Sequence, residues 1–98
     1  MMNRVPNKTV VSNWYFDNPS ASHNGQLSTD GKNLFSYRQL IGVTLADGSK
    51  VALNYRSGKG GCYIGQTTST HVGYASQITG VTTMSPEVAK EAGLIDVL

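Results

Sequence analysis

The sequence contains few of the residues that most often carry chemistry. It has a single cysteine, Cys62, which cannot form a disulfide within the chain, so nothing in it requires an oxidising compartment. Charged residues make up only 14% of the sequence. This composition excludes a solvated helical rod and an acidic disordered tail, and it is typical of a globular domain rich in turns.

Long hydrophobic runs are also missing. No stretch approaches the roughly 18 consecutive apolar residues that a membrane span needs. The first residues, Met1 to Pro6, lack the apolar run of a signal peptide. We therefore expect a cytoplasmic protein that neither inserts into nor crosses a membrane.

Paired metal ligands and catalytic motifs are absent from the sequence as well. His23, Cys62 and His71 show no spacing of the Cys-x-x-Cys or His-x-x-x-His kind, so we expect no metal and no cofactor. A Cys62–His71 nucleophilic pair would need an orienting group and an oxyanion site, and nothing in the spacing demands them. The protein is expected not to be an enzyme.

The length allows one domain. A chain of 98 residues and 10.5 kDa cannot bury two separate cores, so residues 1–98 are expected to form a single domain. The net charge of +2 and the pI of about 8.8 are too weak to indicate nucleic-acid binding by themselves. Function must then be sought in local patterns.

The strongest local pattern lies in residues 34–56. Two apolar runs flank Asp47-Gly48, the pair that a tight hairpin turn prefers, so we expect an antiparallel hairpin. Residues 9–16 are dense in β-branched and aromatic side chains and predict a further strand beside it. Residues 62–65 can add another short strand.

Two helices are predicted after the hairpin. Residues 68–79 carry an apolar stripe at helical spacing that includes Tyr74 and Ile78. Residues 86–92 follow a serine with proline at the first helical position, which predicts a short C-terminal helix. Residues 17–33 are polar and predict a long loop. The expected fold is α+β, a small antiparallel sheet packed on one helix.

Three consecutive aromatic residues are the first candidates for binding. In a strand, Tyr15 would face away from Trp14 and Phe16, so at least one ring would lie outside the core. Such a ring can stack on a base, anchor a protein partner, or be covered by the long loop or a second subunit. The sequence does not choose among these.

Basic residues and a glycine-rich segment add a second group. Residues 57–61 contain Lys59 but lack the order of a phosphate-binding P-loop, so a flexible loop and a phosphate contact both stay open. Arg38 and Arg56 could serve a nucleic acid, with Tyr15, Tyr55 or Tyr63 as stacking partners. The candidate partner-binding residues are Trp14, Tyr15, Arg38, Arg56, Lys59 and Tyr63.

Two short motifs stand out in residues 34–78. Residues 35–42 contain the pattern Ser-Tyr-x-x-x-Ile-Gly, and residues 67–71 read Thr-Thr-Ser-x-His. With these motifs the chain resembles a group of small uncharacterised bacteriophage proteins, which share a Ser-Tyr-x-x-x-Ile-Ala/Gly strand and a Thr-Thr-Ser-x-His start of a helix. The resemblance covers residues 34–78, about half of the chain, and its motif has no agreed chemistry. Residues 57–66 are an insertion relative to that group, so Lys59 is a candidate for what this member does differently.

The resemblance implies a function through the habits of small phage proteins. It suggests a non-enzymatic binding protein that occupies or inhibits a host macromolecule, with a host-defence protein as one such partner in the host cytoplasm. Nucleic-acid or nucleotide binding through the basic and aromatic surface is the alternative. The exposed edges of so small a sheet also predict a homo-oligomer.

Overall fold

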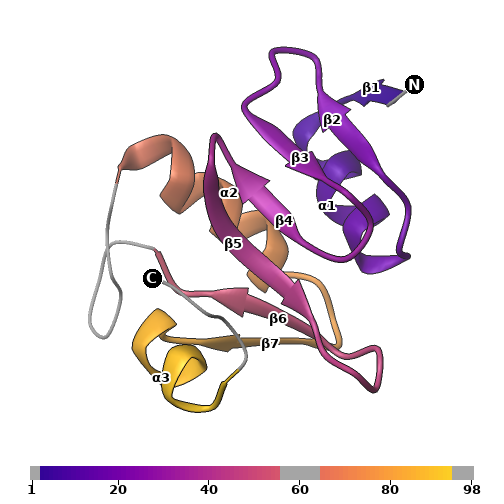
Figure 1. Ribbon diagram of the computed structural model, residues 1–98. Coiled ribbons are helices and arrows are strands. Elements are labelled where there is room, and N and C mark those ends of the chain that lie inside the picture. The colour runs from indigo at the N-terminus through magenta and orange to yellow at the C-terminus, as the bar shows by residue number, and fades with distance from the viewer. Residues whose placement is uncertain (1–2, 56–64, 94–98) are drawn as a thin grey trace.

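The computed structural model describes residues 3–55 and 65–93, which form an α+β fold with one mixed sheet (Figure 1). The seven strands follow each other across the sheet in chain order, and the sheet does not close. The strands are β1 (Asn3–Val5), β2 (Ser20–Ser22), β3 (Leu27–Thr29), β4 (Leu34–Ser36), β5 (Gln39–Thr44), β6 (Lys50–Leu53) and β7 (Val81–Met84). The helices are α1 (Asn7–Tyr15), α2 (Gln66–Ser76) and α3 (Pro86–Glu91).

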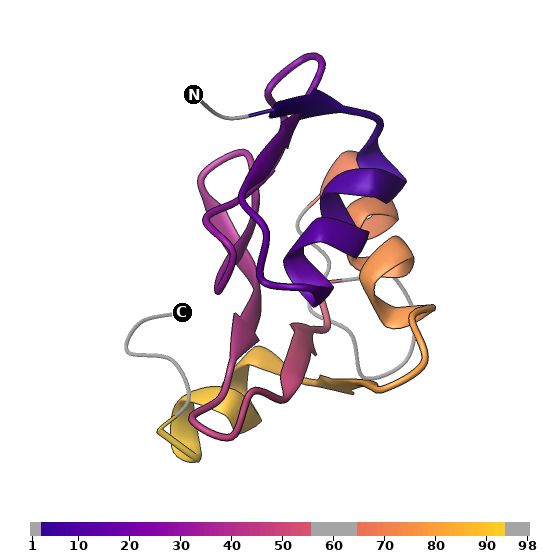
Figure 2. The ribbon, with the colours of Figure 1, turned by 90° about the vertical axis from the view of Figure 1, so that its right-hand side faces the viewer.

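The sheet is larger than the predicted one, and it is mixed instead of antiparallel. Strands β2 to β6 pair antiparallel, whereas β1 pairs with β2 and β6 with β7 in parallel. A parallel pair needs a crossover connection, and α1 and α2 lie in these two connections. The alternating directions make β1 and β6 run the same way, so right-handed crossovers place both helices on one face. Figures 1 and 2 show α1 and α2 on that shared face, and α3 on the opposite side.

The predicted strand over residues 9–16 is wrong, because this segment forms α1. Val10, Val11 and Trp14 are buried, and their spacing is that of a helical stripe. The carbonyl of Pro6 accepts hydrogen bonds from the amides of Thr9 and Val10 at the first turn. Packing of this stripe against the sheet outweighs the strand preference of the β-branched and aromatic side chains.

The predicted loop over residues 17–33 is also wrong over much of its length. It contains β2 and β3, whose buried side chains include Ser20, Ser22 and Thr29. The Ser22 hydroxyl accepts the amide of Leu27 at 3.1 Å and donates to Asn24 Oδ1 at 2.7 Å. Because such bonds satisfy the hydroxyls of Ser22 and Thr29 inside the sheet, a polar sequence here does not signal an exposed loop.

The hairpin around Asp47-Gly48 is confirmed. β5 pairs with β6, with Val43 opposite Val51, and Gly48 has the positive φ of +89° that this turn uses. The Asp47 side chain accepts the amide of Ser49 at 2.9 Å. The earlier part of the predicted hairpin instead forms the separate strand β4.

Both helices after the hairpin are confirmed with shifted bounds. The helix predicted over residues 68–79 is α2, and that over 86–92 is α3. The Ser85 hydroxyl accepts the amide of Val88 at 3.2 Å, as an N-cap does. The predicted strand over 62–65 lies outside the described residues except for Gly65, which precedes α2. Strands β1 and β7 were not predicted.

Candidate functional site

A groove between α1 and α2 is the best candidate for a binding site. It has a volume of about 380 Å³ and is open to solvent. We call it the aromatic groove, since three of its residues are aromatic. Its lining residues are Lys8, Val11, Ser12, Tyr15, Phe16, Tyr74, Gln77, Ile78 and Thr79.

The periodicity of the two helices explains why these side chains meet. On α1, Lys8, Val11 and Tyr15 follow each other at three and four residues, so they share one stripe. From α2 and the turn after it come Tyr74 and Ile78, again four residues apart. The aromatic groove is therefore the seam between two helices that also contact each other.

The aromatic rings give this groove its character. Phe16 is 66% exposed, a large apolar side chain left in solvent at the end of α1. Its ring meets that of Tyr15 edge to face, with centroids 5.2 Å apart and planes at 89°. The Tyr15 hydroxyl lies close to Gly80, since a Cβ added at Gly80 would come within 2.7 Å of it.

The electrostatics of the groove come from Lys8. Its ammonium lies 5.5 Å from the centre of the Tyr74 ring, a cation–π distance. Lys8 is the one charged residue among the described residues that line the groove, and neither α1 nor α2 contains Asp or Glu. The groove thus combines an apolar, aromatic lining with the positive charge of Lys8.

The structure separates the residues predicted for binding. Tyr15 lies in the aromatic groove, and Arg38 lies in the β4–β5 turn. Trp14 belongs to the core, with no exposed surface, and its indole Nε1 donates to the Lys32 carbonyl at 3.0 Å, so it offers no surface for a partner. Tyr55 is also buried.

The remaining three predicted residues, Arg56, Lys59 and Tyr63, lie outside the described residues, as does the glycine-rich segment 57–61.

Sequence reasoning missed most of the groove. A strand over residues 9–16 places Phe16 on the same face as Trp14, and Phe16 is not among the predicted binding residues. Lys8 and Tyr74 are not among them either. If residues 7–15 are treated as a helix, Lys8 and Tyr15 fall on a different face from the buried Trp14.

A buried polar cluster joins α2 to β4. The Ser36 hydroxyl lies 2.7 Å from His71 Nδ1 and 3.1 Å from Thr68 Oγ1. A serine paired with a histidine is the geometry of an activated nucleophile. Here Ser36 is fully buried and His71 is 1% exposed, so no substrate reaches the pair. The cluster is structural, and burial lowers the pKa of His71.

The buried histidine predicts an acid-sensitive fold. Because the pKa of His71 is lowered in the folded state, the unfolded chain takes up the proton first, and stability falls as pH drops below about 6.5. Urea unfolding at pH 7.5 and at pH 5.5 measures the difference. The carboxyls of Asp17, Asp30 and Asp47 have lowered pKa values and stay ionised in this range.

Two variants isolate this effect. His71→Gln should lose most of the difference between the two pH values, whereas His23→Gln, changed at an exposed histidine, should keep it. If the free energy of unfolding changes equally with pH in wild type and in His71→Gln, the buried histidine is not the cause of the acid sensitivity.

A buried lysine forms a second polar cluster. Lys50 is 3% exposed, and its Nζ donates to Asp17 Oδ1 at 2.7 Å, Thr44 Oγ1 at 2.6 Å and the Gly31 carbonyl at 3.2 Å. It also lies 5.5 Å from the centre of the Trp14 ring. The hydrogen bond from Lys50 is the main cause of the lowered pKa of Asp17. With three acceptors for its three N–H groups, Lys50 is a structural cation.

Residues 3–55 and 65–93 hold no group of three His, Cys, Asp or Glu side chains that could bind a metal ion. Within the same ranges, no helix has the length and apolar character needed to cross a membrane.

Comparisons with known proteins give no family. No protein-family model matches the chain, and neither the curated proteins nor the solved structures contain a match. The resemblance to small bacteriophage proteins therefore stays a prediction from the sequence.

Proposed function

We propose that this protein is a non-enzymatic binding protein that holds a segment of another protein in the aromatic groove. The observation that carries the proposal is the Phe16 ring, 66% exposed at a groove that Tyr15 and Tyr74 line. Exposed aromatic side chains beside a pocket are typical of residues that dominate protein–protein binding. Burying Phe16 under a partner removes a large apolar surface from water.

Charge defines the chemistry of the partner segment. The groove supplies one cation, Lys8, and no carboxylate among its described lining residues. A segment with apolar side chains flanked by Asp or Glu fits both properties, because the apolar groups fill the groove and the acidic flank meets Lys8. A basic flank would be repelled.

The sequence resemblance adds an expectation about the partner's origin. It implies a host protein, such as a defence component, that is occupied or inhibited in the cytoplasm. Self-association is a separate prediction, for which the outer strands β1 and β7 are the candidate edges. Neither expectation is needed for the groove itself to bind a peptide.

Selection from a random peptide library tests the proposal. The immobilised full chain should enrich peptides that combine large apolar residues with neighbouring Asp or Glu. With Lys8→Glu as the bait, the enriched flanks should change from acidic to basic, because the charge of the groove is reversed. Phe16→Ala should weaken an enriched peptide about 30-fold, the size expected for an interface anchor.

The matched control is Val88→Ala. Val88 is also a large apolar side chain exposed to solvent, at 51%, but it lies on α3. Its replacement should leave peptide affinity unchanged. Enrichment of no common sequence, or equal losses in Phe16→Ala and Val88→Ala, would remove the groove as the binding site.

A further inference from the structure

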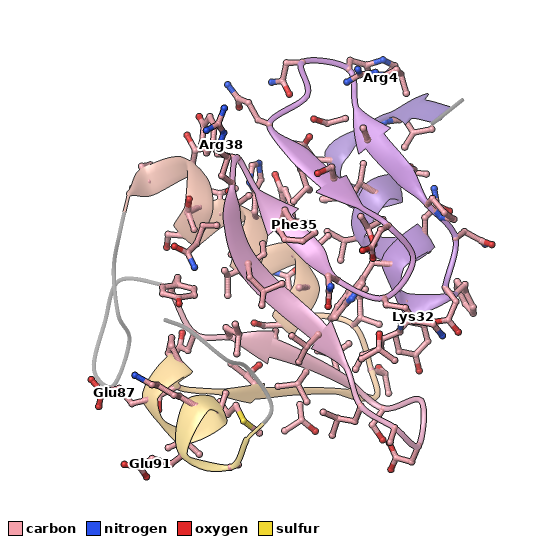
Figure 3. All side chains as sticks on the ribbon, in the orientation of Figure 1. Arg4, Lys32, Phe35, Arg38, Glu87 and Glu91 are labelled. Atoms are coloured by element: carbon pink, nitrogen blue, oxygen red, sulfur yellow. The ribbon has the colours of Figure 1, made fainter. Side chains whose placement is uncertain are left out.

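A second surface lies on the opposite face of the sheet. Ala21, Ser28, Phe35 and Leu40 are cross-strand partners from β2 to β5, so their side chains form one row on one face. Figure 3 shows Phe35 in front of the sheet, on the side away from α1 and α2. Phe35 is partly exposed, and no described helix lies over it in Figure 3.

The turn beside this row is strained. Tyr37 follows β4 with a positive φ of 56°, a region that bulky residues rarely adopt and that favours glycine. Its amide donates to the Gln26 carbonyl at 2.6 Å, which ties the β4–β5 turn to the β2–β3 turn. Even so, Tyr37 is 53% exposed. A strained and exposed aromatic residue is unfavourable for folding, and such residues gather at functional sites.

Positive charge gathers at the same end of the sheet. Arg38 follows Tyr37 in the turn, and Arg4 pairs with Ala21 at the β1 end of the row. Residues 18–29 and 31–46 contain no Asp or Glu. In Figure 3, Arg4 and Arg38 lie at the top of the sheet, whereas Glu87 and Glu91 lie at the far lower end.

We propose that this surface, formed by Phe35, Tyr37, Arg38 and Arg4, binds single-stranded nucleic acid. Unpaired bases can stack on the two rings, and the two arginines can contact phosphates along one strand. A duplex hides its base faces, so the rings favour a single strand. The proposal goes beyond the peptide groove, which lies on the other face of the sheet.

Fluorescence anisotropy with a labelled oligothymidylate of about 12 nucleotides tests the proposal on the full chain. Two phosphate contacts predict that log affinity falls with log salt with a slope of about −1.4. Tyr37→Gly removes the ring and suits the positive φ, so it should keep the fold and weaken binding about 5- to 100-fold. Tyr37→Phe keeps the ring and should bind like wild type.

Other variants separate the contributions. Arg38→Gln should reduce the magnitude of the salt slope by about 0.7. Phe35→Leu keeps an apolar side chain but removes the flat ring, and it should also weaken binding. Phe16→Ala, in the aromatic groove, should leave oligonucleotide binding unchanged, which distinguishes the two surfaces.

Three results would overturn the proposal. The first is absence of binding by wild type at low salt. The second is that Tyr37→Gly and Tyr37→Phe bind the oligonucleotide with equal affinity, when separate thermal unfolding curves show that both variants are folded. The third is displacement of the oligonucleotide by an equal concentration of thymidine monophosphate, which would indicate a site for a mononucleotide.

Discussion

Replacing Trp14 with alanine is expected to lower the free energy of unfolding by about 3–5 kcal/mol, the range typical of a buried tryptophan. Trp14 is fully buried, and its indole meets the Lys32 carbonyl while its ring lies beside the Lys50 ammonium. The loss is a large part of the roughly 5–15 kcal/mol that a domain has in total. Urea unfolding followed by circular dichroism measures it.

Phe16→Ala is the matched control. Trp14 lies in α1 and Phe16 directly follows its last residue; two residues of helical rotation turn their side chains about 200° apart, so Trp14 is in the core and Phe16 is in solvent. Phe16→Ala should therefore change stability by less than about 0.5 kcal/mol. In a strand the two rings would share a face, and the two losses would be similar. Similar losses would refute the helix.

Gly42→Ala is expected to lower the free energy of unfolding by about 1–3 kcal/mol through overpacking. A Cβ at Gly42 would stand 2.8 Å from Trp14 Cζ2 and 3.0 Å from Leu34 Cβ. Both neighbours are fully buried and cannot move aside freely. The glycine is thus needed where β5 passes under the indole.

A double-mutant cycle measures this contact. Trp14→Phe makes the ring smaller, so adding Gly42→Ala to it should cost less than adding Gly42→Ala to wild type. Gly48→Ala, where nothing lies within 4 Å of the added atom, reports the cost of a positive φ without a clash. Strict additivity of Trp14→Phe and Gly42→Ala would show that the two residues do not meet.

Much of the fold after residue 40 could be predicted because its signals are local. Asp47-Gly48 specifies a turn by its own backbone preferences, and Ser85 with Pro86 specifies a helix start. These elements formed where the sequence placed them, with end residues shifted by a few positions. The parallel partner β7 was missed, because its pairing with β6 joins segments far apart in the chain.

The first part of the fold could not be predicted from local preference. Residues 9–16 contain good strand formers, and their helical stripe becomes decisive only when the sheet is present to bury it. In residues 17–33, the hydroxyls of Ser22 and Thr29 form hydrogen bonds inside the sheet, so a polar sequence there does not indicate an exposed loop.

The candidate site depends on these missed elements. Tyr15 is a predicted binding residue, whereas Tyr74, which lines the same groove, lies on α2, and the packing of the two crossover helices places both beside the groove. Arg38 is also predicted, while the neighbouring Tyr37, with its positive φ, donates its amide to Gln26 in a separate turn. Neither arrangement leaves a pattern in a single sequence.

A partner bound in the seam between α1 and α2 should perturb the residues that line this groove, and an NMR titration measures the effect residue by residue. The isotopically labelled full chain is titrated with the peptide that the library selection enriches. The largest chemical-shift changes are expected at the amides of Val11, Phe16 and Ile78, with those of Phe35 and Tyr37 unchanged. Largest changes on the opposite sheet face, or changes spread evenly over the domain, would refute binding in the aromatic groove.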